Sequence, residues 1–164
     1  MNTSWVNGLI ENNKRVNFFL VINCILIVIL AFQSKEISKL DTGMMLVSEF
    51  IVWLVTFLDE IKYKHLLGHH RLLIATSMAG MPLDKKSLIT CVSISNTYKP
   101  MNLACAIINI LPLTNVLSRA LSINSATGMA LTYFTILEII YISFMYFYWH
   151  YISLKYKSFL IKEE

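Results

Sequence analysis

Residues 129–151 read MALTYFTILEIIYISFMYFYWHY and carry one formal charge, Glu138. At a rise of about 1.5 Å per residue, a helix over this stretch is about 34 Å long, which is enough to cross a hydrocarbon core of about 30 Å. The stretch therefore predicts a membrane span. Its C-terminal end holds a group of aromatic side chains that suit a headgroup interface: Tyr146, Phe147, Tyr148, Trp149 and Tyr151.

The overall composition indicates that lipid, rather than water, surrounds much of the chain. Hydrophobic residues make up 56% of the sequence and charged residues 15%, whereas a soluble domain carries about a quarter charged residues. The net charge of +4 does not predict a nucleic-acid partner, because the basic residues are scattered between apolar runs. The three cysteines form no C-x-x-C pair and favour small packing residues over a disulfide scaffold.

Three further apolar runs are predicted to span the membrane, at about residues 16–33, 43–58 and 101–118. The run 43–58 is the shortest, and its neighbours favour a membrane location more than its own length does. Pro100 is expected in the first turn of the third span, where its missing N–H costs nothing. Pro112 lies inside that span and is expected to kink it.

The segments outside these runs are predicted to lie at the membrane surface. Residues 2–15 predict a short interfacial helix capped by Thr3 or Ser4. A cleaved signal peptide is the competing interpretation, which the long leader and Glu11 disfavour. Residues 59–99 hold no run long enough to span and are predicted to form a cytoplasmic loop, within which Asp84 caps a short helix.

The basic residues predict the orientation. Of the 14 lysines and arginines, only Lys35, Lys39 and Arg119 fall in the short connections after the first and third spans. The others precede the first span, lie in residues 59–99 or follow the fourth span. Because cytoplasmic segments are enriched in lysine and arginine, both termini and residues 59–99 are predicted to be cytoplasmic.

Polar side chains within the apolar runs carry the most informative chemistry. A charge at the bilayer centre costs about 2.5–3.5 kcal/mol on insertion scales, so an intramembrane carboxyl needs a partner or a proton. Counting the helical rise places a polar group from every span in the outer half of the bilayer. An interhelical polar layer is the favoured interpretation, ahead of a docking face for a partner's helix and of a proton or ion path. The candidate residues are Glu49, Asn109, Asn115, Arg119 and Glu138.

Three histidines in the predicted cytoplasmic loop raise a metal hypothesis. His65 and His69 stand four residues apart, which would place both rings on one helical face. However, Gly68 weakens a helix there and no third ligand stands at a recognisable spacing. A basic patch facing the membrane surface is therefore favoured over a metal site, and we expect no metal or cofactor. The patch comprises His65, His69, His70, Arg71, Lys85 and Lys86.

The general format, a small basic chain with four predicted spans and no large domain outside them, resembles the TraS-type entry-exclusion proteins of F-like conjugative plasmids. It also resembles the immunity proteins for pore-forming colicins. Residues 93–100, SISNTYKP, are similar to a Ser-Ile-x-x-x-Tyr-x-Pro run of that second family, although they follow two spans, which departs from its pattern. Both resemblances imply a non-enzymatic protein that binds another membrane-embedded machine. The large predicted cytoplasmic segment favours exclusion.

The sequence thus predicts an all-α, polytopic protein of the bacterial inner membrane. It forms one membrane domain with four transmembrane helices and cytoplasmic N and C termini. The predicted mechanism is stoichiometric binding to another integral membrane protein, which is a conjugation apparatus, a toxin or a transporter. Membrane lipid is the other expected partner, nucleic acid is not expected, and a homo-oligomer is compatible with the sequence. An accessory subunit of a transporter or secretion complex is the alternative class.

Overall fold

Four long helices make up the described part of the computed structural model. The backbone is described for residues 4–33, 38–123 and 126–162, and side chains for residues 7–33, 38–110 and 126–161. Over these residues the chain has four α-helices and no strand, so the all-α prediction is confirmed. The helices are α1 (Ser4–Gln33), α2 (Lys39–Met78), α3 (Lys85–Ile123) and α4 (Ala126–Lys162).

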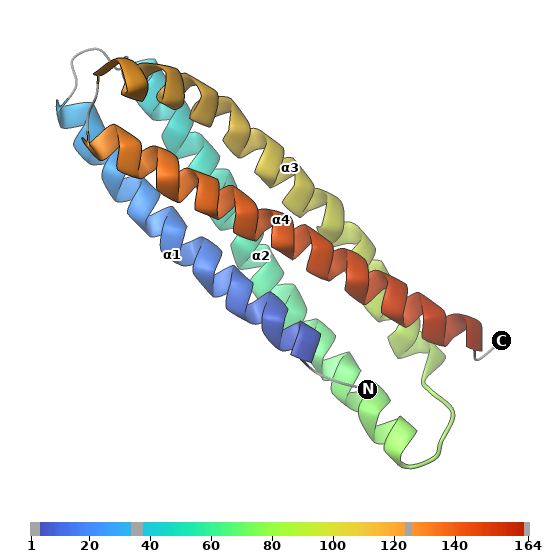
Figure 1. The fold of residues 1–164 in the computed structure, drawn as a ribbon. Helices are drawn as coiled ribbons and strands as arrows, with labels where there is room; N and C mark the ends of the chain where they lie inside the picture. The colour runs from blue at the N-terminus through green and yellow to red at the C-terminus, as the bar shows by residue number, and fades with distance from the viewer. Residues whose placement is uncertain (1–3, 34–37, 124–125, 163–164) are drawn as a thin grey trace.

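The helices form one elongated bundle in which successive helices run antiparallel (Figure 1). Each helix packs against its neighbours in the chain, and α4 closes the ring by packing against α1. As a result, both ends of the chain and the turn between α2 and α3 lie at the same end of the bundle (Figure 1).

The turn between α2 and α3 has a clear local cause. Gly80 adopts a φ of 66°, which a residue with a side chain rarely adopts. The backbone N–H groups of Gly80 and Met81 bond to the carbonyl oxygens of Ser77 and Thr76, at 3.2 and 3.0 Å, which closes the end of α2 as a Schellman motif. Asp84 then accepts a hydrogen bond from the backbone N–H of Ser87 at 3.0 Å. Its predicted role as a helix cap is confirmed.

The helices are longer than the segments predicted from hydropathy. The expected interfacial helix at residues 2–15 is continuous with the first predicted span, because α1 begins at Ser4 and runs without a break. Its predicted cap at Thr3 lies outside the described residues. The predicted loop at residues 59–99 is mostly helical, since α2 continues to Met78 and α3 begins at Lys85.

Packing, rather than hydropathy, explains why α2 and α3 extend this far. Tyr63, Leu66, His70 and Leu73 are buried at spacings of three and four residues, so one face of α2 stays in the bundle core. Pro100 lies inside α3 and not in its first turn, which corrects the sequence prediction. A proline there removes one backbone hydrogen bond, and the buried Tyr98 nearby helps hold the helix in place.

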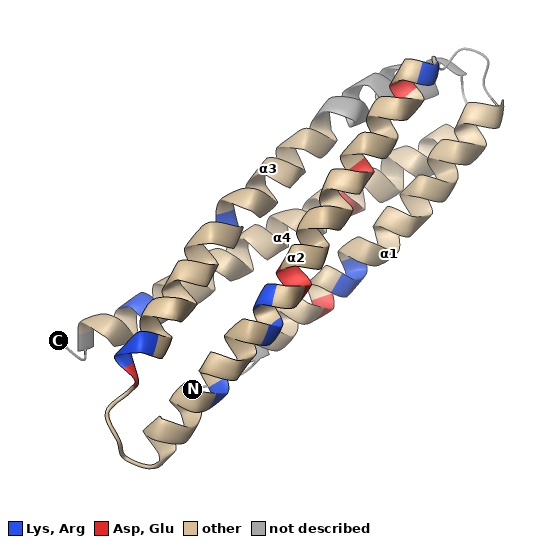
Figure 2. Ribbon diagram, turned by 180° about the vertical axis from the view of Figure 1, so that it is seen from behind, with Lys and Arg blue, Asp and Glu red and all other residues tan. Residues whose placement is uncertain are grey.

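The composition of core and surface changes along the bundle. Towards the end that holds the termini, the core is an apolar and aromatic cluster that includes Leu66, Trp149 and Tyr156. Most lysines and arginines also lie in this half (Figure 2). In the other half, large apolar side chains such as Phe18 and Phe50 point outward while polar side chains are buried.

Within the residues that the structure describes, two helices are long and apolar enough to cross a membrane, judged by length and composition. They cover Asn7–Gln33 in α1 and Ala126–Ile161 in α4. This finding fits the membrane prediction weakly, because a buried core helix or a signal sequence meets the same criteria.

Candidate functional site

A cluster of four polar side chains, one from each helix, lies inside the half of the bundle with the apolar surface. We call it the central cluster; each member is at most 3% exposed, and it consists of Asn23, Glu49, Asn109 and Glu138. The structure therefore brings together three of the polar residues singled out from the sequence. It adds Asn23, whose helical depth matched theirs but whose contact with Glu138 required the fold.

The carboxyl group of Glu138 is the hub of the central cluster. Asn23 donates a hydrogen bond from its Nδ2 to Glu138 Oε2 at 2.5 Å. The side chains of Glu49 and Asn109 lie close enough to interact with the same carboxyl group. Two cysteines border the cluster, Cys24 on α1 and Cys105 on α3. The two carboxyl groups are therefore surrounded by neutral side chains from α1 and α3.

Hydrogen bonding within the central cluster is incomplete. Asn23 Oδ1, Glu49 Oε2 and Glu138 Oε1 are buried and have no hydrogen-bond partner among the described residues. Both polar side-chain atoms of Asn109 are in the same condition. Buried polar groups are rarely left without partners, because each costs free energy comparable to a lost hydrogen bond. Oxygen atoms in this arrangement are suited to holding a proton or a hard cation.

A second polar contact level lies nearer the termini. Thr56 on α2 donates to Asn17 Oδ1 on α1 at 2.9 Å. Asn102 on α3 donates to Asp59 Oδ2 on α2 at 2.9 Å and to its own helix at the carbonyl oxygen of Tyr98. Burial raises the pKa of Asp59 to about 7, against a lowering effect of the Asn102 hydrogen bond. The sequence analysis did not single out Asp59, because it stands just outside the second predicted span.

The six residues of the predicted basic patch do not form one surface. His70 is fully buried, with its Nδ1 and the Tyr156 hydroxyl 2.8 Å apart in a hydrogen bond, so its assignment to a surface patch is corrected. Burial also lowers its pKa, which favours the neutral ring. His69 contacts Ser87 Oγ on α3 at 3.0 Å and His65 at 3.3 Å. The other three patch residues are exposed: Arg71, Lys85 and Lys86.

Two candidates from the sequence cannot be placed. The side chains of Asn115 and Arg119 lie outside the described residues, as does that of Pro112. The backbone of α3 continues through all three positions. Among the described side chains, no group of three or more histidine, cysteine, aspartate or glutamate residues is arranged to hold a metal ion.

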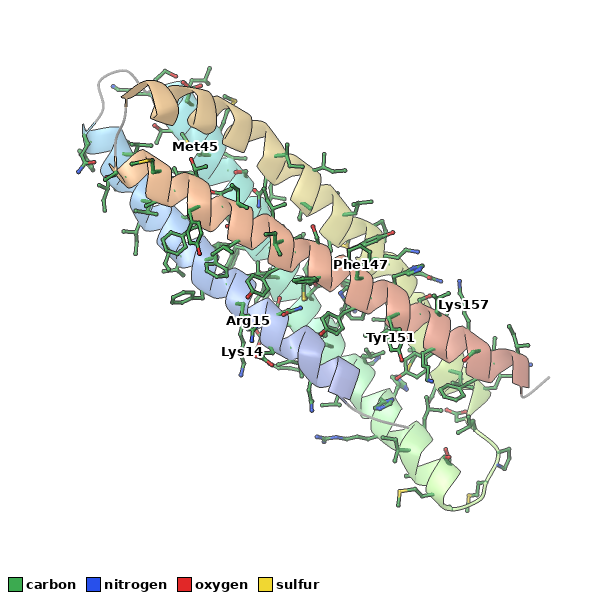
Figure 3. All side chains as sticks on the ribbon, viewed as in Figure 1. Lys14, Arg15, Met45, Phe147, Tyr151 and Lys157 are labelled. Carbon is green, nitrogen blue, oxygen red and sulfur yellow. The ribbon has the colours of Figure 1, made fainter. Side chains whose placement is uncertain are left out.

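A groove of about 780 Å³ runs between α1 and α4 and is lined by Arg15 together with aromatic side chains. Arg15 donates to the Tyr141 hydroxyl at 3.5 Å, lies 5.4 Å from the centre of that ring and pairs with Glu11. Phe147 and Tyr151 line the groove farther along α4, and Figure 3 shows both on the helix that covers Arg15. The groove is therefore lined by one positive charge, Arg15, which is already paired with Glu11, and by aromatic side chains.

Comparisons of this chain with protein-family models, with curated proteins and with solved structures found no match.

Proposed function

We propose that the chain forms a four-span bundle in the bacterial inner membrane, with spans at about residues 16–33, 43–58 and 101–118. The fourth span covers the part of 129–151 that precedes Tyr141, because Tyr141 contacts Arg15, which lies just before the first span. The observation that carries this proposal is the combination of a buried polar cluster with an apolar surface in one half of the bundle. There the central cluster is buried, while Phe18, Phe50 and other large apolar side chains are exposed. In water an apolar surface of this kind promotes aggregation, whereas in lipid it is the expected surface of a helical bundle.

The distribution of charge supports an orientation with both termini in the cytoplasm. Most lysines and arginines lie in the half that holds the chain ends and the turn between α2 and α3 (Figure 2). The positive-inside rule assigns that half to the cytoplasmic side. The proposed spans cover only part of each helix, so the remaining helical segments continue beyond the membrane as a bundle.

We further propose that the protein acts by stoichiometric binding to a membrane-embedded partner, as in the exclusion of an incoming conjugative plasmid. An aromatic row on the outer face of α2 supports this: Phe50, Trp53 and Phe57 are all exposed, with neighbouring rings 5.7 Å apart. At this depth only lipid or another membrane helix reaches the row, so a transmembrane helix of the transfer apparatus is the proposed occupant. Stacked aromatic side chains suit such contacts because they bury much area and lose little conformational freedom.

The experiment expresses the protein alone in recipient cells and challenges them with donors that carry F-like conjugative plasmids. Exclusion predicts fewer transconjugants than in recipients with an empty vector. Replacing Phe50, Trp53 and Phe57 by alanine should restore transfer, whereas Val21→Ala with Ile25→Ala, which also trims exposed apolar side chains, should not. Membrane levels of every variant are measured by immunoblot. Unchanged transfer into cells with a normal membrane level of the protein would exclude this function.

The same recipients distinguish the two alternatives. Survival of a challenge with pore-forming bacteriocins would favour an immunity protein, which meets a toxin's helical hairpin within the membrane. Stable co-purification with a larger permease or ATPase during normal growth would favour an accessory subunit. The aromatic row on α2 is compatible with either partner, so the challenge experiments decide between them.

A further inference from the structure

We propose that the central cluster binds one small hard cation, a proton or a sodium ion, in the middle of the bundle. This inference rests on the proposed membrane location but not on the proposed partner. It concerns the same four side chains, Asn23, Glu49, Asn109 and Glu138, which all four helices contribute.

Charge balance is the first step of the argument. Glu49 and Glu138 are close enough to interact, and each is almost fully buried. Among the described side chains, the groups that face them from the neighbouring helices are amides and thiols: Asn23 and Cys24 on α1, with Asn109 and Cys105 on α3. Amide and thiol side chains never carry a positive charge. Two carboxylates without a compensating charge are costly within lipid. A bound cation removes part of that cost.

The unpaired oxygen atoms are the second, independent observation. Glu49 Oε2, Glu138 Oε1, Asn23 Oδ1 and Asn109 Oδ1 are all buried and have no hydrogen-bond partner among the described residues. Carboxylate and amide oxygens are the ligands that hard cations prefer. One donor, Asn109 Nδ2, is also unpaired, so acceptors outnumber donors among the unpaired atoms of the cluster. A proton on either carboxyl group supplies a further donor, and a hard cation binds the oxygen atoms directly.

Simple interhelical bonding explains the central cluster less well. At the second polar contact level, Asn102 makes two hydrogen bonds, at 2.9 and 3.0 Å, and so links α3 to α2 while its amide is satisfied. Asn109, seven residues further along α3, is equally buried and lies near the Glu138 carboxyl group, but neither its Oδ1 nor its Nδ2 has a hydrogen-bond partner among the described residues. A residue kept only to join helices should resemble Asn102. The unpaired side chain of Asn109 instead fits the role of a cation ligand.

The test uses the full chain reconstituted in lipid nanodiscs and measures its thermal unfolding from pH 5 to pH 9. In choline chloride, the unfolding temperature should fall as the pH rises, because loss of the proton leaves two adjacent negative charges. At high pH, sodium chloride should restore it if the site accepts sodium, and potassium chloride should restore it less because the ion is larger. If the site accepts only protons, neither salt will differ from choline chloride.

The variant Glu49→Gln with Glu138→Gln should lose the part of both responses that belongs to the cluster. Asp59 is present in every sample, so the difference between wild type and variant isolates the central cluster. Glu60→Gln, the same change at an exposed position, is the matched control and should behave as wild type. If the double variant responds to pH and sodium as wild type does, the proposal is overturned.

A second measurement covers the case in which the double variant does not fold. Infrared spectra of the Asp59→Asn variant, which lacks the other buried carboxyl group, should contain the carbonyl band of a protonated buried carboxyl group, which shifts in D₂O. That band should disappear when the pH rises or, for a sodium site, when sodium is added at constant pH. Absence of both the band and any sodium effect would overturn the proposal. Alkaline carbonate extraction of cell membranes separately reports whether the proposed membrane location fails.

Discussion

The two halves of the bundle differ in their surfaces and in the polar residues that they bury. In the half that holds the termini, the core is apolar and aromatic, with Leu66 and Trp149 at 0% exposure, and the surface carries most of the charge. In the other half, Glu49 and Glu138 are buried and the surface exposes side chains such as Phe50. Both halves bury apolar residues, but only the second combines two buried glutamates with a surface of large apolar side chains.

The level at which the surface changes is narrow. Arg15 and Tyr141 contact each other there, as do Asp59 and Asn102. All four helices pass this level without a break. A continuous backbone that changes its surface chemistry at one level is the pattern expected for the proposed membrane boundary. The predictions below test whether lipid is that medium.

The largest effect is expected from a charge placed on the outer surface. Ile107 on α3 and Leu72 on α2 are similarly exposed, at 54% and 47%, but lie in opposite halves. Ile107→Asp should cost about 3–4 kcal/mol on the insertion scale, because an aspartate replaces an apolar side chain within lipid. Leu72→Asp should stay within about 0.5 kcal/mol, because it faces water.

The measurement for this pair is the fraction of protein recovered in carbonate-washed membranes. We expect a marked loss for Ile107→Asp and normal recovery for Leu72→Asp. Equal recovery of the two variants would mean that both surfaces meet the same solvent, and the comparison between the halves would collapse.

A cavity in each core should sharpen the comparison. Leu66→Ala, in the half with the charged surface, should cost about 2–5 kcal/mol, as buried leucines do in water-soluble cores. Leu131→Ala, in the half with the apolar surface, should cost only about 1–2 kcal/mol, because lipid tails are as apolar as the core and only packing is lost. Both residues are almost fully buried. Unfolding in mixed micelles measures each cost, and a larger loss at Leu131 would contradict the membrane interpretation.

Hydropathy predicted the apolar half better than it predicted the helices. It placed the spans near the segments with apolar surfaces, but it ended them where charges begin, at Lys14 and Asp59. The helices continue because residues such as Leu66 and Leu73 repeat at helical spacing below that level. The lysines and arginines between them lower the mean hydropathy of this stretch, but they do not interrupt the buried face of the helix. Asp84 was recognisable as a cap because its signal is local.

The central cluster was predictable only in part, for a related reason. An acidic or amide residue within an apolar run is conspicuous, which identified Glu49, Asn109 and Glu138. The contact between Asn23 and Glu138 depends on α4 returning beside α1, and no local pattern encodes that. His70 was wrongly predicted to be exposed because Arg71 beside it is charged and exposed, whereas its own side chain is buried in the core.

The pH dependence of stability should reveal the Asp59 contact. Burial raises the pKa of Asp59 from 3.8 to about 7, so the folded state keeps a proton that the unfolded state has lost. Its contribution to stability therefore falls as the pH rises from about 4 to about 7, by up to about 4 kcal/mol. Asp59→Asn should remove that decline and be the more stable protein at pH 8. Unfolding from pH 4 to pH 8 measures this, with Glu60→Gln as the surface control.

The smallest effects should come from the two helix caps, where the contrast between the halves disappears. Ser38 accepts a hydrogen bond from the Asp41 backbone at the start of α2, and Asp84 caps α3 at the opposite end of the bundle. Both ends lie beyond the proposed spans and meet water, so Ser38→Ala should cost only about 1 kcal/mol. Asp84→Ala should also cause a small loss.

The two cap variants should differ in their response to acid. Hydrogen bonds from Ser87 lower the pKa of Asp84, so its contribution is present above the unfolded value of 3.8 and is lost as the pH falls. The stability difference between wild type and Asp84→Ala should therefore shrink in acid, whereas that for Ser38→Ala should not. Unfolding temperatures at pH 3 and pH 7 test this. A cost for Ser38→Ala as large as that for Ile107→Asp would place the start of α2 within lipid and shift the proposed boundary.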